Sequence, residues 1–209
     1  TITVVLNAQP DSDVVLSITS SDTGEATVTS TLTFTSANWD TAQTVTVTGA
    51  DDDLVDGTVS STITVSVDDA NSDDDFDGVA DQTVSVSTTD DDVAGFTVAE
   101  TEGSTTVTEA GSTDTITVVL NAQPTSDVVI AISSNDTGET AVNGSTVNNN
   151  SLTFTSANWD TAQSFTVTGV DDDLVDGTVE STLTISVVDA LSDNGFDGVA
   201  DQTVTASTT

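Results

Sequence analysis

The sequence predicts an all-β chain built from tandem immunoglobulin-like antiparallel β-sandwiches with seven strands each. Three observations predict this fold. Short segments alternate β-branched residues with Thr and Ser, clusters of Asp, Gly and Asn separate these segments, and no segment has helical periodicity. Apolar residues make up 35% of the 209 residues, which argues against a disordered acidic chain.

The alternation is clearest at Ile2, Val4 and Leu6, and it recurs throughout the chain. In the second half we expect strands near 96–108 (split at Gly103), 114–120, 127–133, 151–155, 163–169, 179–188 and 202–208. Seven short strands separated by turn residues are typical of a sandwich. The aromatic pairs Phe34 with Trp39 and Phe154 with Trp159 are expected to anchor the two cores, with ligand stacking by the Trp residues as the alternative.

The chain contains two copies of one unit. TITVVLNAQP occurs at 1–10 and 115–124, and LTFTSANWDTAQ occurs at 32–43 and 152–163. Because 90–114 has no counterpart, residues 1–89 are predicted to be a repeat lacking its first strand and 90–209 a complete repeat within a longer array. The second copy is longer between Gly138 and Leu152, where an Asn/Gly/Ser-rich stretch predicts a surface loop.

The charge of the chain is entirely one-sided. It contains 36 Asp and Glu residues and no Lys, Arg or His, so its formal charge is −36. Cations from outside the chain must offset the repulsion, either as bound divalent ions or as a salty medium. Nucleic acid and anionic lipid are excluded as partners because they require basic residues, and no apolar run is long enough for membrane insertion.

The acidic residues gather at the ends of predicted strands. DDDLVDG occurs at 51–57 and again at 171–177, and a further DDD stands at 90–92, at the junction of the two repeats. Adjacent carboxylates on a turn repel each other unless a cation lies between them, and Ca²⁺ takes six to eight oxygen ligands. Calcium is therefore the predicted cofactor, and an ion at 90–92 would be shared by both repeats. A solvated acidic turn is the alternative.

A third cluster has the spacing of a calcium loop. Residues 71–81 read NSDDDFDGVAD, which gives D-x-D-x-D-G-x-x-D without the Glu that closes an EF-hand loop. The predicted ligands are Asp73, Asp75, Asp77 and Asp81, and in the second copy Asp193, Asp197 and Asp201. Gly195 replaces Asp75 there, so weaker binding is expected. An acidic hairpin without metal is the alternative.

The ordered motifs T-E-A-G, S-x-D-T-G, L-T-F-T-x-x-x-W, DDD-x-x-D and a closing DDD cover most of the chain. In this order they resemble the Calx-beta domain, and more closely the Calx-beta-like tandem repeats of large bacterial surface proteins. The resemblance implies calcium at one end of each sandwich. It implies as ligands Glu109, Asp136, Asp171, Asp172, Asp173 and Asp176 in the second repeat, and Asp22, Asp51, Asp52, Asp53, Asp56, Asp90, Asp91 and Asp92 in the first. The family often has Glu where Asp56 and Asp176 stand.

The sequence favours a function without catalysis. Without His, Cys or Lys, catalysis would fall to carboxylates and hydroxyls, and these are clustered on turns. The leading hypothesis is a calcium-rigidified structural repeat of an extracellular, cell-surface protein such as an adhesin, a fibre or a surface layer. Its expected partners are neighbouring repeats or identical subunits, with a cell-surface or glycan target in addition. The alternatives are a filament subunit that polymerises by β-strand complementation, and a carbohydrate- or ice-binding module, for which Thr44, Thr46 and Thr48 would form an ice-binding face.

Overall fold

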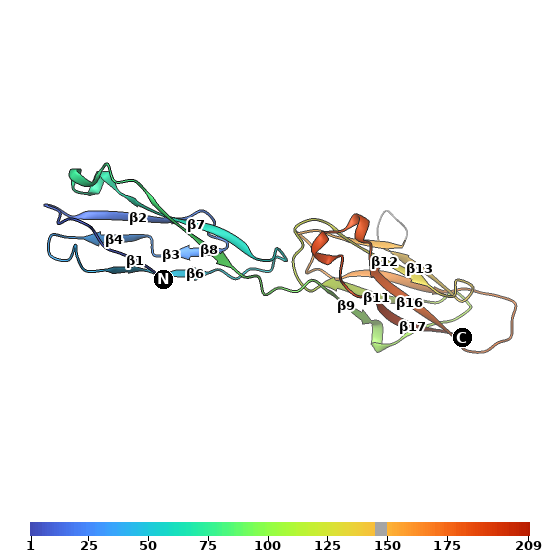
Figure 1. Cartoon of the computed structure of the whole chain (residues 1–209). Coiled ribbons are helices and arrows are strands. Elements are labelled where there is room, and N and C mark those ends of the chain that lie inside the picture. The colour runs from blue at the N-terminus through green and yellow to red at the C-terminus, as the bar shows by residue number, and fades with distance from the viewer. Residues whose placement is uncertain (145–149) are drawn as a thin grey trace. The chain divides into compact units, whose positions relative to one another are not determined.

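A computed structural model of the chain describes residues 1–144 and 150–209, which form β-strands and short 3-10 helices (Figure 1). The chain divides into two compact units. The first comprises Thr1–Asp52 and Gly57–Asp90, and the second comprises Asp53–Asp56 and Asp91–Thr209. In the described part of the chain, no helix has the length and apolar character to span a membrane.

The second unit is a two-layer sandwich. Its strands are β9 (Phe96–Glu100), β10 (Thr105–Val107), β11 (Thr113–Leu120), β12 (Val128–Ser134), β13 (Thr140–Gly144), β14 (Ser151–Phe154), β15 (Gln163–Gly169), β16 (Val179–Val187) and β17 (Gln202–Thr208). One sheet has the order β13-β15-β11-β9 and the other β10-β17-β16-β12-β14. All neighbours are antiparallel except β10 and β17, which are parallel. The all-β, antiparallel sandwich predicted from the sequence is confirmed.

The core of the second unit lies between its two sheets. Buried residues alternate with less buried ones along β11, β15 and β16, as period-2 strands require. The rings of Phe154, Phe165 and Phe196 are fully buried, and Trp159 packs against them only partly buried. The prediction for Phe154 is therefore confirmed, whereas Trp159 lies at the margin of the core.

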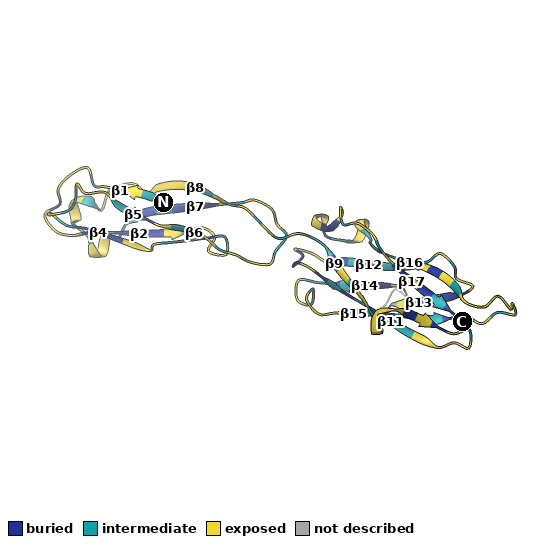
Figure 2. Ribbon diagram, turned by 90° about the horizontal axis from the view of Figure 1, so that it is seen from below, coloured by how far each residue is buried: buried dark blue, intermediate teal, exposed yellow. Residues whose placement is uncertain are grey.

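The first unit repeats this plan with fewer paired strands. Its strands are β1 (Ile2–Val4), β2 (Val14–Ser20), β3 (Ala26–Val28), β4 (Thr31–Phe34), β5 (Gln43–Val45), β6 (Val47–Gly49), β7 (Val59–Val67) and β8 (Gln82–Thr88). One sheet has the order β4-β2-β7-β8. The two-stranded pairs β1-β5 and β3-β6 correspond to the second sheet of the other unit. Its buried cluster is smaller and centres on Phe34, which is fully buried as predicted. Figure 2 shows the buried stripe along β7 beside the exposed β8.

Two features of the strands differ from the sequence prediction. The stretch after Gly138 was expected to be a loop, but Thr140–Gly144 forms β13 and pairs with β15. The prediction is wrong because pairing and the burial of Val142, 8% exposed, outweigh the low strand propensity of Asn and Gly. The remainder of that predicted loop, 145–149, lies outside the described residues. The Thr44–Thr48 stretch is interrupted at Thr46, between β5 and β6.

Candidate metal centre

Three carboxylates of the second unit converge at one end of the sandwich. Glu139 stands directly before β13, while Asp172 and Asp176 belong to the loop between β15 and β16. Their ligand oxygens all lie within 4.8 Å of one another. Among the described residues no other three acidic side chains come together this closely. Asp172 and Asp176 were predicted ligands, and Glu139 was not.

The turn that carries Glu139 is fixed by its own sequence. The carboxylate of Asp136 accepts a hydrogen bond from the backbone N–H of Gly138 at 3.1 Å, which forms an Asx turn. The carbonyl of Asp136 accepts from the N–H of Thr140 at 3.1 Å and from the hydroxyl of Ser134 at 2.9 Å. These bonds close the loop so that Glu139 points toward the β15–β16 loop.

The backbone of Glu139 is also held by both sheets. Its carbonyl accepts a hydrogen bond from the N–H of Val170 at 2.9 Å and from the hydroxyl of Thr208 at 3.3 Å. Val170 follows β15, and Thr208 is the last residue of β17. Glu139 is therefore attached to a rigid part of the sandwich, whereas its two partners lie on an exposed loop.

The side chain of Glu139 is buried without compensation. It is 6% exposed, and its Oε2 atom has no hydrogen-bond partner among the described residues. Burial raises the pKa of this carboxyl, and the negative charges of Asp176, Asp172, Asp136 and Glu109 raise it further. Since the chain contains no cationic side chain, the charge on Glu139 can be balanced only by a proton or by an ion from solution.

The loop that carries Asp172 and Asp176 turns sharply between β15 and β16. The carboxylate of Asp172 accepts from the N–H of Leu174 at 2.7 Å, and Gly177 turns the chain with a φ of +79°. A hollow of about 380 Å³ adjoins Asp176 and is lined by Glu109 and Thr209 among others, but Glu139 and Asp172 do not line it. Three carboxylates can supply up to six oxygens, which suits Ca²⁺. The residues present therefore fit a calcium ion.

The other ligands predicted for the second repeat lie around this centre. Asp136 and Glu109 are close enough to raise the pKa of Glu139, and Asp171 and Asp173 are exposed on the same loop outside the three-carboxylate group. The calcium prediction for these four residues stays a prediction.

The residues predicted for the first repeat do not form such a group among the described residues. The carboxylate of Asp22 accepts from the N–H of Gly24 at 3.0 Å, and that of Asp90 from the N–H of Gly57 at 2.8 Å. Asp51 and Asp52 belong to the first unit, whereas Asp53 and Asp56 belong to the second and Asp91 and Asp92 follow in it. Metal binding by this set stays a prediction.

The motif at 71–81 has a local structural role. The carboxylate of Asp73 accepts hydrogen bonds from the N–H groups of Asp11, Ser12 and Asp75 at 2.7, 3.0 and 3.1 Å. It caps the 3-10 helix η2 (Asp74–Phe76) and ties it to the segment before β2. The backbone bonds from Ser12 and Asp75 lower the pKa of Asp73.

Asp193 has the same role in the second unit. It is 5% exposed and accepts from the hydroxyl of Thr125 at 2.6 Å, and from the N–H groups of Ser126 at 2.7 Å and Gly195 at 2.8 Å. Burial raises its pKa, but these hydrogen bonds outweigh burial and lower it overall. The remaining predicted ligands of the two loops join no three-carboxylate group: Asp75, Asp77, Asp81, Asp197 and Asp201. Calcium binding there stays a prediction.

The sequence repeat shows that Glu139 recurs at the same position in both copies. SDTGE at 21–25 and NDTGE at 135–139 place a Glu at the same position of the same turn in both copies. The carbonyl of Glu25 accepts from the N–H of Ala50 at 2.8 Å and from the hydroxyl of Thr88 at 2.9 Å, which matches the backbone of Glu139. The sequence shows this Glu, but only the fold shows that its carboxylate is buried beside the acidic loop.

Comparison with known proteins finds similarity only among solved structures. No family model and no curated protein matches the chain. The crystal structure of domains 4 and 5 of the S-layer protein SbsC is 14% identical with a TM-score of 0.38, covering 92% of this chain and 70% of that one. The apo-form Calx CBD1 domain is 17% identical with a TM-score of 0.35, covering 55% and 97%. The calcium binding domain CBD12 of CALX1.1 is 15% identical with a TM-score of 0.35, covering 88% and 72%. These similarities concern the fold and assign no function to this chain.

Proposed function

We propose that this chain is a non-catalytic structural segment of an extracellular, cell-surface protein of the adhesin, fibre or surface-layer type, and that bound calcium stiffens the ends of its sandwiches. One observation carries the calcium part of the proposal. Glu139 is a buried carboxylate with an unpartnered oxygen, and it faces Asp172 and Asp176 in a chain with no cationic side chain.

The chemistry of the donor set favours calcium over other metals. Only oxygen ligands are available, because the chain contains no His or Cys, so soft and borderline metals have no preferred ligand. Mg²⁺ requires a near-ideal octahedron and retains its water, whereas Ca²⁺ accepts irregular sets of six to eight oxygens. Two ligands on an exposed loop and one on a rigid turn suit the less demanding ion.

A bound ion would act mechanically. It would join the β15–β16 loop to the turn before β13, and it would replace repulsion among three carboxylates by attraction to a shared cation. A ligand that binds only the folded state stabilises it by mass action, by about 2.7 kcal/mol when its concentration is one hundred times Kd. This coupling suits a module that must stay rigid outside the cell, where calcium is abundant.

The absence of His, Cys and Lys from the sequence supports a non-catalytic function, since the usual general acids, bases and nucleophiles are missing. The carbohydrate- or ice-binding alternative, which concerns Thr44, Thr46 and Thr48, stays a prediction. The strand-complementation alternative concerns the first unit, whereas the candidate metal centre lies in the second, so the two can be tested separately.

Calorimetric titration of the full chain with calcium tests the metal site. The parent chain is expected to bind Ca²⁺ and to melt at a higher temperature with calcium than with a chelator. Glu139→Gln should lose at least one binding event, whereas Asp160→Asn, which removes an exposed charge from another turn, should behave as the parent. Equal calcium binding by the parent chain and Glu139→Gln would contradict this site.

A further inference from the structure

A short helix of the second unit contains an asparagine followed by a glycine. The 3-10 helix η5 (Asn194–Phe196) begins at Asn194, and both Asn194 and Gly195 are exposed. In an Asn-Gly pair the glycine has no side chain to hinder attack by its backbone nitrogen on the side-chain carbonyl carbon of the asparagine. Asn194 is therefore a reactive amide, and its lifetime depends on how the fold holds Gly195.

The fold holds Gly195 through the carboxylate of the residue before the helix. Asp193 is buried, and its carboxylate accepts a hydrogen bond from the N–H of Gly195 at 2.8 Å. The carbonyl of Asp193 accepts from the N–H of Phe196 at 2.9 Å, and the ring of Phe196 is fully buried. A helical backbone turns the nitrogen of each residue away from the side-chain carbonyl carbon of the residue before it. The capped helix therefore keeps the two reacting atoms apart.

The first unit has a carboxylate at the position of this amide. Its helix η2 is the counterpart of η5, and Asp74 stands where the second unit has Asn194. Both side chains are exposed. The N–H of Asp77 donates to the carbonyl of Asp74 at 3.4 Å, and the N–H of Asp197 donates to the carbonyl of Asn194 at 3.4 Å. The same backbone thus accepts either side chain, so a carboxylate at residue 194 is compatible with the fold.

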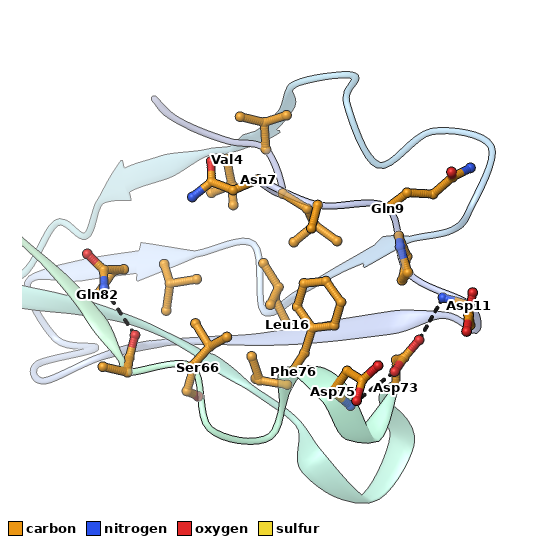
Figure 3. Close-up of a pocket in the computed structure, with 18 residues that line it drawn as sticks. Val4, Asn7, Gln9, Asp11, Leu16, Ser66, Asp73, Asp75, Phe76 and Gln82 are labelled. Atoms are coloured by element: carbon orange, nitrogen blue, oxygen red, sulfur yellow. Dashed lines mark hydrogen bonds between the residues drawn. The ribbon is translucent and has the colours of Figure 1, made fainter.

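The residues that cap the two helices also match. The backbone φ and ψ are −60° and 123° at Asp73, and −57° and 130° at Asp193. Figure 3 shows the carboxylate of Asp73 hydrogen-bonded to the backbone of Asp11 and of Asp75. The acidic cap is therefore common to both units, whereas only the second unit has an Asn-Gly pair after it.

We propose that Asn194 is a modification site at which the side-chain amide is lost by spontaneous deamidation, and that the Asp193 cap sets the rate. When the helix opens locally, the nitrogen of Gly195 gives up its proton and forms a bond to the side-chain carbonyl carbon of Asn194. The bond from that carbon to the amide nitrogen breaks, and ammonia leaves with the proton, which gives a cyclic succinimide. Water then adds to one of the two ring carbonyl carbons and opens the ring. Water is the only co-reactant, and nothing is oxidised or reduced.

The two products of ring opening differ in their effect on the fold. One product is aspartate, which reproduces Asp74 of the first unit and adds one negative charge to a chain without cationic side chains. The other is isoaspartate, whose main chain contains one additional carbon atom. That atom shifts Gly195 from its hydrogen bond to Asp193 and Phe196 from the core, so isoaspartate should destabilise the second unit whereas aspartate should not. The inference does not depend on the candidate metal centre.

Ageing of the full chain at mildly alkaline pH, followed by peptide mapping, tests the proposal. Chymotrypsin should release residues 192–196, SDNGF, and this peptide should gain the mass difference between an amide and an acid. The peptide excludes the other Asn-Gly pair, Asn143–Gly144, which lies in β13. Conversion in urea should be at least about tenfold faster than in the folded chain, because the reaction requires an opened helix.

Variants of the chain separate the effect of the cap from that of the local sequence. Asp193→Ala should speed conversion in the folded chain at least about fivefold, because loss of a cap makes local opening easier. Thr125→Ala removes only the hydroxyl donor to Asp193, so it should fold and give a smaller increase. Asp197→Ala, at an exposed acid after the helix, should behave as the parent.

The unfolded chain provides the second comparison. In urea Gly195→Ala should convert more slowly than the parent, since its methyl group shields the attacking nitrogen. An Asn194 that stays unconverted in urea would overturn the proposal. So would equal rates of conversion for folded Asp193→Ala, Thr125→Ala and the parent, because the cap would then have no influence on the reaction.

Discussion

The carboxylates of Glu139 and Asp176 approach within 4.8 Å of each other although neither has a cationic side chain nearby to balance it. One is buried at a rigid turn and the other is exposed on a loop. Like charges in this arrangement destabilise the metal-free fold, and a cation between them converts the same pair into a link between turn and loop.

Glu139→Gln should have opposite effects on stability with and without calcium. In chelator, the variant should be more stable than the parent at neutral pH, because a neutral amide removes a buried charge that lies near four other carboxylates. In saturating calcium the order should reverse, since the parent gains ion binding. Thermal melts of both proteins in both buffers measure this. The same order in both buffers would contradict the role given to Glu139.

The raised pKa of Glu139 fixes the sign of a pH effect. Between the ordinary Glu pKa and the raised value, the folded state holds a proton that the unfolded state has released, so the stability of the metal-free chain should fall as pH rises through this window. Calcium needs the carboxylate form, so its affinity should fall as pH is lowered through the same window. Calcium titrations at a series of pH values check the second effect, and denaturant unfolding in chelator checks the first.

The lowered pKa of Asp193 should give a pH dependence of stability opposite to that of Glu139. Its pKa is lowered in the folded state, so its contribution to stability is present above the ordinary Asp pKa of about 3.9 and is lost as pH falls through the lowered value. Asp193→Ala should lower the free energy of unfolding by about 1–3 kcal/mol at neutral pH, because donors from Thr125, Ser126 and Gly195 lose their acceptor. Urea unfolding measures the loss. The exposed neighbour serves as control, and Asp197→Ala should change stability little.

The two repeat glycines should respond differently to substitution. Gly169→Ala should destabilise the second unit by about 1–3 kcal/mol, because its Cβ would overlap the carbonyl of Thr108 and force the backbone apart. Gly49→Ala meets no atom closer than 3.7 Å and should be nearly neutral. Thermal unfolding of the two variants checks this contrast.

Much of the fold follows from the sequence because strand alternation and repeat register are local and visible. The alternation at Ile2, Val4 and Leu6 predicts a strand with one inward face, and Ile2–Val4 forms β1, which pairs with β5. β13 could not be predicted, since its Asn and Gly are poor strand formers and its pairing with β15 is a long-range property.

The three-carboxylate group could be predicted only in part, because runs of Asp identify loops and not the atoms that meet, and metal binding by it stays a prediction. Asp172 and Asp176 belong to a charge cluster that is visible in the sequence, whereas Glu139 is an isolated acid before a strand, and only the fold brings it to them. The spacing at 71–81 suggested calcium, yet Asp73 and Asp193 use their carboxylates as caps for backbone N–H groups. A capping acid and a metal ligand have the same sequence signature, and they differ in which donors the fold brings to them.

A crystal structure of the full chain grown in calcium tests the central claim most directly. We predict an ion bound by oxygens of Glu139, Asp172 and Asp176 at about 2.3–2.6 Å, the range of calcium–oxygen bonds. A structure in which these three side chains hold no ion at saturating calcium would contradict the account.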